Sequence, residues 1–155
     1  VRFDPASRRE CPREVAGDSG AHTRYADGYP ALVIGQASLD ELNRRLAIGG
    51  IAPMAMRRFR PNIVLEGIQA HDEDHLDTIE AGGVVLRLVK PCTRCQVTTI
   101  DPATGHPGRE PLATLASYRR DDRAGGVTFG MNAIVVAGAG RPLAVGERAR
   151  CAFRF

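Results

Sequence analysis

Apolar residues occur along this chain in short runs that are separated by glycine, proline and polar clusters. Short runs rich in β-branched residues are typical of buried strands. They predict strands over 31–35, 62–65, 83–89 and 94–100, and two or three more over 127–155, with Pro91 ending the third strand. Many short strands with few helices predict a mostly β fold: a barrel-like or curled sheet with one or two peripheral helices.

Two segments carry helix signals. In the first, leucines recur at helical spacing, at Leu39, Leu42 and Leu46. Ser38 is a good N-cap and Glu41 follows three residues later, so a capping box is expected to start this helix. Gly49 is expected to end it. The second helix is predicted over 111–118, because proline is favoured at a first helical position.

The length of 155 residues suits one domain. Residues 1–25 are polar and are interpreted as an irregular lead-in, and residues 26–155 as the domain. The chain starts with Val1 rather than methionine and shows no signal peptide, so we expect a trimmed piece of a longer protein in a reducing, cytoplasmic compartment. No apolar run is long enough to cross a membrane, so no membrane partner is expected.

The charge pattern argues against a nucleic-acid partner. The formal net charge is +3, and all basic residues except Lys90 are arginine. These arginines are scattered, and aromatic residues make up only 5% of the chain, so a basic and aromatic stripe for nucleic acid is not supported.

The segment 90–101 is the densest in reactive groups. In a strand over 94–100, Cys95, Val97 and Thr99 would share one face. Cys95 would lie at the strand mouth, near Lys90 and Arg94, where cations favour the thiolate. The CxxC spacing leaves four interpretations open: a zinc site lacking its usual partners, a thioredoxin-like dithiol, two inert core thiols, or a single thiolate that acts as ligand or nucleophile.

Three other segments carry weaker signals. Residues 57–62, Arg-Arg-Phe-Arg-Pro-Asn, form either an anion clamp or a solvated basic loop. Asn132, after Gly130, either points into a pocket or follows a plain turn, and Gly130 allows close backbone approach. Residues 71–77, with His71 and His75, are interpreted as a solvated acidic loop or short helix.

Several motifs in this order resemble one family. They are Phe-Arg-Pro-Asn-Ile-Val at 59–64, Cys-Thr-Arg-Cys at 92–95, Thr-Thr-Ile-Asp-Pro-Ala-Thr-Gly at 98–105, Glu-Pro-Leu at 110–112, Tyr-Arg at 118–119 and Phe-Gly-Met-Asn at 129–132. With weaker similarity from Ala26 onward, they resemble the MOSC domain over roughly four-fifths of the chain, in the branch of the amidoxime-reducing proteins and N-hydroxylated-base reductases.

The resemblance implies a β-barrel-like fold that holds a molybdopterin-type molybdenum cofactor, and a family-level association with pyridoxal phosphate binding. It implies that Cys95 is the molybdenum ligand and the catalytic residue. The cofactor-binding residues implied are Arg60, Asn62, Thr93, Arg94, Asp101 and Asn132. It also implies an electron-donor protein with an iron–sulfur or haem centre, and an N-terminal β-rich domain that precedes the MOSC domain in this branch.

Three functional hypotheses follow. The first is the cofactor-binding domain of an oxidoreductase that reduces N-hydroxylated or N-oxide-type substrates. In the second, Cys95 carries a persulfide and the domain is a sulfur carrier. In the third, the chain is a truncated, non-catalytic domain that binds an anion or a partner.

Overall fold

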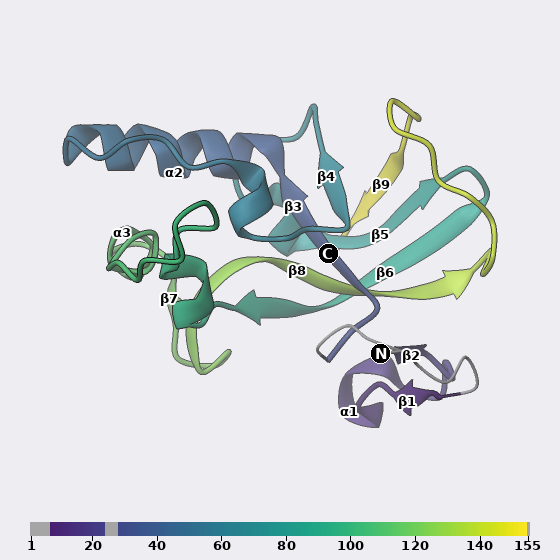
Figure 1. Cartoon of the computed structure of the whole chain (residues 1–155). Coiled ribbons are helices and arrows are strands. Elements are labelled where there is room, and N and C mark those ends of the chain that lie inside the picture. Colours follow the sequence, from purple (N-terminus) through teal and green to yellow (C-terminus); the bar gives the residue numbers. More distant parts are fainter. Residues whose placement is uncertain (1–6, 24–27, 155) are drawn as a thin grey trace. The chain divides into compact units, whose positions relative to one another are not determined.

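The computed structural model describes residues 7–23 and 28–154 (Figure 1), so the expected domain start at Ala26 lies outside the described residues. The protein is 33% strand and 23% helix, which confirms the mostly β fold class. The chain divides into two compact units. Unit 1 consists of the described residues of 1–31, 75–90 and 132–155, and unit 2 of 32–74 and 91–131.

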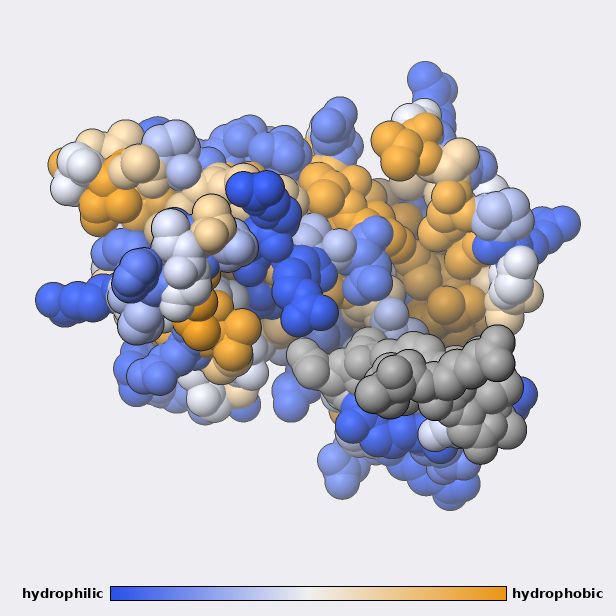
Figure 2. Space-filling model, viewed as in Figure 1, coloured by the Kyte–Doolittle hydropathy of each residue, from blue (hydrophilic) through white to orange (hydrophobic). Residues whose placement is uncertain are grey.

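Unit 1 is built on antiparallel strands. Strand β5 (Leu76–Ala81) lies between β9 (Arg150–Phe153) and β6 (Val84–Thr93), and β6 is followed by the second half of β8 (Gly126–Ala137). Figure 2 shows hydrophobic residues over these strands and a hydrophilic surface over β1 (Arg9–Glu10) and α1 (Arg13–Ala16). With β2 (His22–Thr23), these two elements occupy the described part of the expected lead-in.

Unit 2 contains the main core. Strand β3 (Ala31–Gly35) pairs in parallel with β4 (Ile63–Leu65) and also neighbours the first half of β8, which pairs with β7 (Arg120–Asp121). The helices are α2 (Gln36–Ile48), α3 (Leu112–Ala116) and the short 3-10 helices η1 (Met56–Arg58), η2 (Asp72–His75) and η3 (Gln96–Thr99). The fully buried cluster consists of Ile34, Leu39, Leu42, Leu46, Phe59, Leu115 and Phe129.

Strands β3 and β8 approach each other closely at Gly130, a position where the glycine allows close backbone approach. Gly130 has φ 79°, and a Cβ there would lie 2.6 Å from Ile34 Cγ1 and 2.7 Å from the Val33 carbonyl oxygen. Both the positive φ and the missing space require glycine. This contact holds the strand that leads into α2 against the strand that carries Phe129.

Helix α2 starts earlier than its sequence suggests, so the expected capping box is wrong. The helix begins at Gln36 after the N-cap Gly35. Ser38 instead donates its hydroxyl to Glu73 (Oγ–Oε2 2.8 Å), and Glu41 pairs with Arg44 and Arg45. A buried tertiary partner has replaced the local cap. The predicted end of the helix at Gly49 and the buried leucine face are confirmed.

Strand β6 continues through Pro91 to Thr93, so the expected break at that proline is wrong. Proline is tolerated in a strand where its missing N–H removes no ladder hydrogen bond. The register of β6 with β5 ends at Arg87, before Pro91 is reached. Within the described residues, no helix is both long and apolar enough to cross a membrane.

Candidate functional site

The chain changes from strand to 3-10 helix at Cys95. Thr93 is the exposed last residue of β6, and Cys95 is the exposed N-cap of η3, with a free thiol. The predicted strand over 94–100 is therefore wrong, and so are the side-chain faces derived from it. The Cys95 carbonyl accepts bonds from the Thr98 hydroxyl (2.9 Å) and the Thr98 N–H (3.2 Å). Hydroxyls that bond to nearby carbonyls compete with strand formation and favour such turns.

The Arg94 side chain joins the two segments that the sequence singled out. Its Nη2 donates to the Phe59 carbonyl at 2.8 Å, directly before Arg60, and its Nη1 donates to Cys92 Sγ at 3.0 Å. Its backbone N–H donates to the Val127 carbonyl at 2.8 Å. Among the described residues its Nε is buried without a partner. Arg94 therefore fixes the CxxC segment against the Arg-Pro-Asn segment.

Arg60 and Asn62 lie on either side of Pro61. Arg60 is exposed and has a φ of 55°, which is unusual for a residue with a side chain. Asn62 Oδ1 accepts the Leu32 N–H at 2.8 Å, and the Asn62 N–H donates to the Leu32 carbonyl at 2.9 Å. Asn62 thus holds the start of β4 on β3, and its amide nitrogen is the group available to a ligand.

Asp101 starts a turn over residues 101–105. Its Oδ1 accepts the N–H groups of Ala103 (2.7 Å) and Thr104 (3.2 Å), and these two donors hold the pKa of its carboxyl below the usual value. Arg58 donates to the carbonyls of Thr98 (3.3 Å) and Ile100 (3.0 Å) and approaches Asp101 at 3.8 Å. Arg58 therefore fixes the segment after Cys95. The sequence indicates Arg58 only as part of the basic segment 57–62.

Two residues expected near Cys95, Lys90 and Asn132, belong to unit 1. Lys90 is exposed and Asn132 is half-buried within β8, where the expected turn is absent because the strand already begins at Gly126. The four cysteines are free thiols, and the described residues hold no group of three or more metal-ligating side chains. Of the cofactor-binding residues that the resemblance implies, Arg60, Asn62, Thr93, Arg94 and Asp101 belong to the same unit as Cys95.

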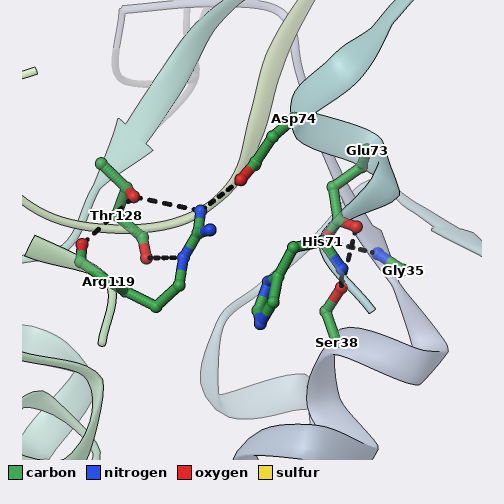
Figure 3. A network of polar contacts seen from close by, with 7 residues as sticks. All are labelled: Gly35, Ser38, His71, Glu73, Asp74, Arg119 and Thr128. Carbon is green, nitrogen blue, oxygen red and sulfur yellow. Dashed lines mark hydrogen bonds and ion pairs between the residues drawn. The ribbon is translucent and has the colours of Figure 1, made fainter. Parts of the chain in front are cut away.

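A buried polar network lies elsewhere in unit 2 (Figure 3), where the sequence predicted a solvated segment. Glu73 is completely buried, and its carboxylate accepts the Gly35 N–H (3.1 Å) and the Ser38 hydroxyl (2.8 Å). Ser38 Oγ in turn accepts the His71 N–H at 2.8 Å. Burial raises the pKa of the Glu73 carboxyl. The expectation of a solvated loop is therefore wrong for Glu73, although the alternative of a short helix is confirmed by η2.

The neighbouring residue, Asp74, is part of a half-buried ion pair. Arg119 Nη2 lies 2.5 Å from Asp74 Oδ2 and also donates to the Thr128 hydroxyl at 3.2 Å. The His71 ring lies against Tyr118 and Phe129, and burial with the nearby Arg119 charge lowers the pKa of His71. The three consecutive acidic residues between two histidines are typical of a solvated segment, so the sequence does not indicate that these side chains point inward.

Comparison with known proteins gives consistent matches. The family model described as the MOSC domain matches residues 21–150. The human mitochondrial amidoxime-reducing component 1 is 40% identical over 125 residues, which cover 79% of this chain and 36% of the relative. The mouse component 1 is 38% identical over 133 residues, covering 84% and 38%, and the human component 2 is 42% identical over 125 residues, covering 79% and 36%.

Proposed function

This chain belongs to the MOSC domain family, and from that premise we propose that it is the molybdenum-cofactor-binding domain of an oxidoreductase. The proposed substrates are N-hydroxylated or N-oxide-type compounds. Amidoximes, which the names of these relatives mention, are compounds of the first kind. Cys95 is proposed as the molybdenum ligand and catalytic residue.

One observation carries the proposal: Cys95 is an exposed free thiol that follows a guanidinium anchored to the Arg60 segment. Thiolate is a soft ligand that suits a soft metal site, and a metal held by a pterin dithiolene needs few further protein ligands. Arginine suits a phosphate group because its planar fork gives two parallel hydrogen bonds. These donor types fit a molybdopterin-type cofactor, which supplies two-electron redox chemistry when bound.

The surrounding residues have separate proposed roles. Arg60 is exposed and would bind the anionic end of the cofactor, with the Asn62 amide as a neighbouring donor. Arg94 would act chiefly by positioning, because its guanidinium already bonds to Phe59 and Cys92. Thr93 is exposed and offers a hydroxyl two residues before Cys95 in the sequence. Contacts of Asp101 and Asn132 with the cofactor are part of the same proposal, as the resemblance implied.

The partners of this domain are also proposals. The chain spans 36% of the length of the human component 1 that it matches, so most of that relative lies outside the matched part. We propose a β-rich domain that shares the cofactor, and an electron-donor protein with an iron–sulfur or haem centre. A reducing, cytoplasmic compartment remains our sequence-based prediction, while the relatives are mitochondrial by name.

The test is to produce the protein in a host that makes molybdenum cofactor, and to measure molybdenum and pterin per chain. We expect near-stoichiometric loading of the unchanged protein and at least about tenfold less molybdenum per chain in Cys95→Ala, because the variant lacks the thiolate ligand. Cys151→Ala is the matched control, because it removes a half-buried thiol from unit 1 and should leave loading unchanged.

The outcomes separate the three hypotheses. Equal molybdenum in the unchanged protein and Cys95→Ala would remove Cys95 from the ligand role. Mass spectrometry after incubation with a cysteine desulfurase gives the second readout: one added sulfur on Cys95 without bound molybdenum would favour the sulfur carrier. A stable protein that takes up neither cofactor nor sulfur would instead support a non-catalytic binding domain.

A further inference from the structure

A cavity of about 610 Å³ lies in unit 2, and the residues that line it follow Cys95 in the sequence. Its wall begins at Gln96, the first residue of η3, and continues through the segment around Gly108 to the start of α3. Pockets that bind small organic molecules have volumes of roughly 300–1,000 Å³. The cavity therefore has the size of a substrate site, and its first lining residue directly follows the proposed metal ligand in the chain.

The cavity wall is largely apolar and remains exposed. Val97 is 61% exposed and Ile100 is 40% exposed, and both line the cavity with half-buried Leu112. Figure 2 shows hydrophobic residues at the surface beside α3 and β7. Covering such side chains with a ligand gains about 25 cal/mol per Å² of apolar surface removed from water. The wall thus favours a ligand with a flat or compact hydrocarbon body.

The wall is also held in place without a ligand. The Thr99 hydroxyl donates to the Gln96 carbonyl at 2.7 Å, and the Gly108 N–H donates to the Thr99 carbonyl at 3.0 Å. Arg58 bonds to the Ile100 carbonyl at 3.0 Å from the side of η1. These bonds use the carbonyl groups of η3 and leave its apolar side chains to line the cavity. A preformed pocket binds with less ordering entropy.

Arg109 is the charged side chain among the residues that line this cavity. It is exposed. A carboxylate on the ligand would form charge-assisted, bidentate hydrogen bonds with it. Gln96 adds an amide at the end of the wall nearest Cys95, where a polar N-hydroxylated group would lie. Apolar surface, one cation and a neighbouring amide together define an amphipathic, anionic ligand.

We propose that this cavity is the substrate site for the aromatic body of N-hydroxylated compounds that carry a carboxylate, with Arg109 binding the carboxylate. The inference rests on the proposed function, because it places the substrate relative to Cys95. It adds the substrate class and the residues that select it, Val97 and Arg109.

The test measures binding to the complete chain by isothermal titration and ligand-observed NMR, without requiring turnover. The probes are a carboxylate-bearing aryl amidoxime and the same compound as its neutral methyl ester. For Arg109→Gln we expect about tenfold weaker binding of the carboxylate probe, a typical loss for one charge-assisted contact, and unchanged binding of the ester. For Val97→Asp we expect both probes to bind at least about tenfold more weakly.

Arg123→Gln is the matched control, because Arg123 is an exposed arginine of unit 2 outside the cavity lining. Thermal unfolding checks each variant, and exposed Val97 should tolerate substitution. If Arg109→Gln weakens both probes equally or neither, the carboxylate assignment is wrong. If Val97→Asp changes neither, the substrate lies elsewhere, even where molybdenum loading supports the proposed function. Intact, Val97-dependent binding in a chain that takes up no molybdenum would overturn the function and leave only a ligand site.

Discussion

Unit 2 contains two groups of polar residues that differ in charge, in burial and in how many of their polar atoms have partners within the protein. In the Glu73 group, the Glu73 carboxylate is completely buried and accepts bonds from Gly35 and Ser38, and one oxygen of the half-buried Asp74 carboxylate pairs with Arg119. In the Cys95 group, the thiol and the Arg60 guanidinium are exposed, whereas the Arg94 guanidinium is anchored by two bonds.

The contrast shows how to separate structural from functional polar residues in this chain. A buried polar group stabilises the fold only when it is satisfied, and removing its partner leaves an expensive unpaired group. Exposed polar side chains contribute little to stability and are free to bind a ligand. We therefore expect substitutions in the Glu73 group to change stability, and substitutions at Cys95 to change cofactor binding.

The largest effect is expected for Glu73→Ala. This change removes the acceptor of the Gly35 N–H and the Ser38 hydroxyl and leaves a void in a completely buried position. We expect a loss of about 3 kcal/mol in the free energy of unfolding, measured by urea titration. Glu73→Gln keeps an acceptor and the volume, so it should lose less than half of that amount.

Cys95→Ser gives the other side of the same comparison. Cys95 is exposed, so its unfolding free energy should stay within about 0.5 kcal/mol of the unchanged protein. A loss at Cys95 as large as that at Glu73 would break the distinction between the two groups.

A smaller effect is expected for the Asp74–Arg119 pair. The side chains are 17% and 15% exposed, so water screens the pair only partly. Arg119→Leu should lower the free energy of unfolding by about 2 kcal/mol because Asp74 then lacks its cation. In a double-mutant cycle with Asp74→Leu, the double variant should recover part of this loss. Simple additivity would show that the two side chains do not depend on each other.

The smallest effect is a pH dependence from His71. The groups that act on its pKa are Arg119, Asp74, Glu41 and Arg45, and burial contributes most. The pKa of His71 is lower in the folded protein than in the unfolded chain, where it is about 6.5. As the pH falls below 6.5, the unfolded chain therefore takes up the proton first, which favours unfolding. Stability is thus present above pH 6.5 and falls as the pH drops through that value, by at most about 1.4 kcal/mol per pH unit.

The variant His71→Asn sharpens this assignment. Asparagine tolerates the positive φ of 68° at this position better than most residues. The slope of unfolding free energy between pH 7 and 5 should become shallower in this variant. His106→Asn removes an exposed histidine and should keep the slope of the unchanged protein. An identical slope in all three proteins would assign the pH dependence to other groups.

Local patterns predicted most elements that depend on local chemistry. The strand 31–35 and the buried face with Leu42 follow from apolar runs and helical spacing, and both are confirmed. Gly130 is a residue type that allows close backbone approach, although the sequence left open whether a pocket or a plain turn follows it. The turn at Asp101 follows from a side chain that bonds to its own backbone. In each case the local structure depends on residues close together in the sequence or on the residue type at one position.

The errors arise where a distant partner decides the structure. Ser38 looks like a helix cap, but Glu73, 35 residues away, takes its hydroxyl. Glu73 looks solvated because its neighbours are acidic. Residues 94–100 look like a strand, but threonine hydroxyls turn the backbone into η3. The family motifs indicate which residues act with Cys95. They do not indicate that the Arg94 side chain lies between Phe59 and Cys92, because Phe59 is 35 residues away in the sequence.

Arg60 shows how this domain could be mistaken for one that is easy to stabilise. Its left-handed backbone disfavours any residue with a Cβ, by roughly 1 kcal/mol relative to glycine. A design method that ranks positions by backbone strain would select Arg60→Gly early, and this variant is expected to be more stable. That chain would have lost an exposed guanidinium from the segment that Arg94 anchors, so a screen for thermostability alone would select against the proposed cofactor site.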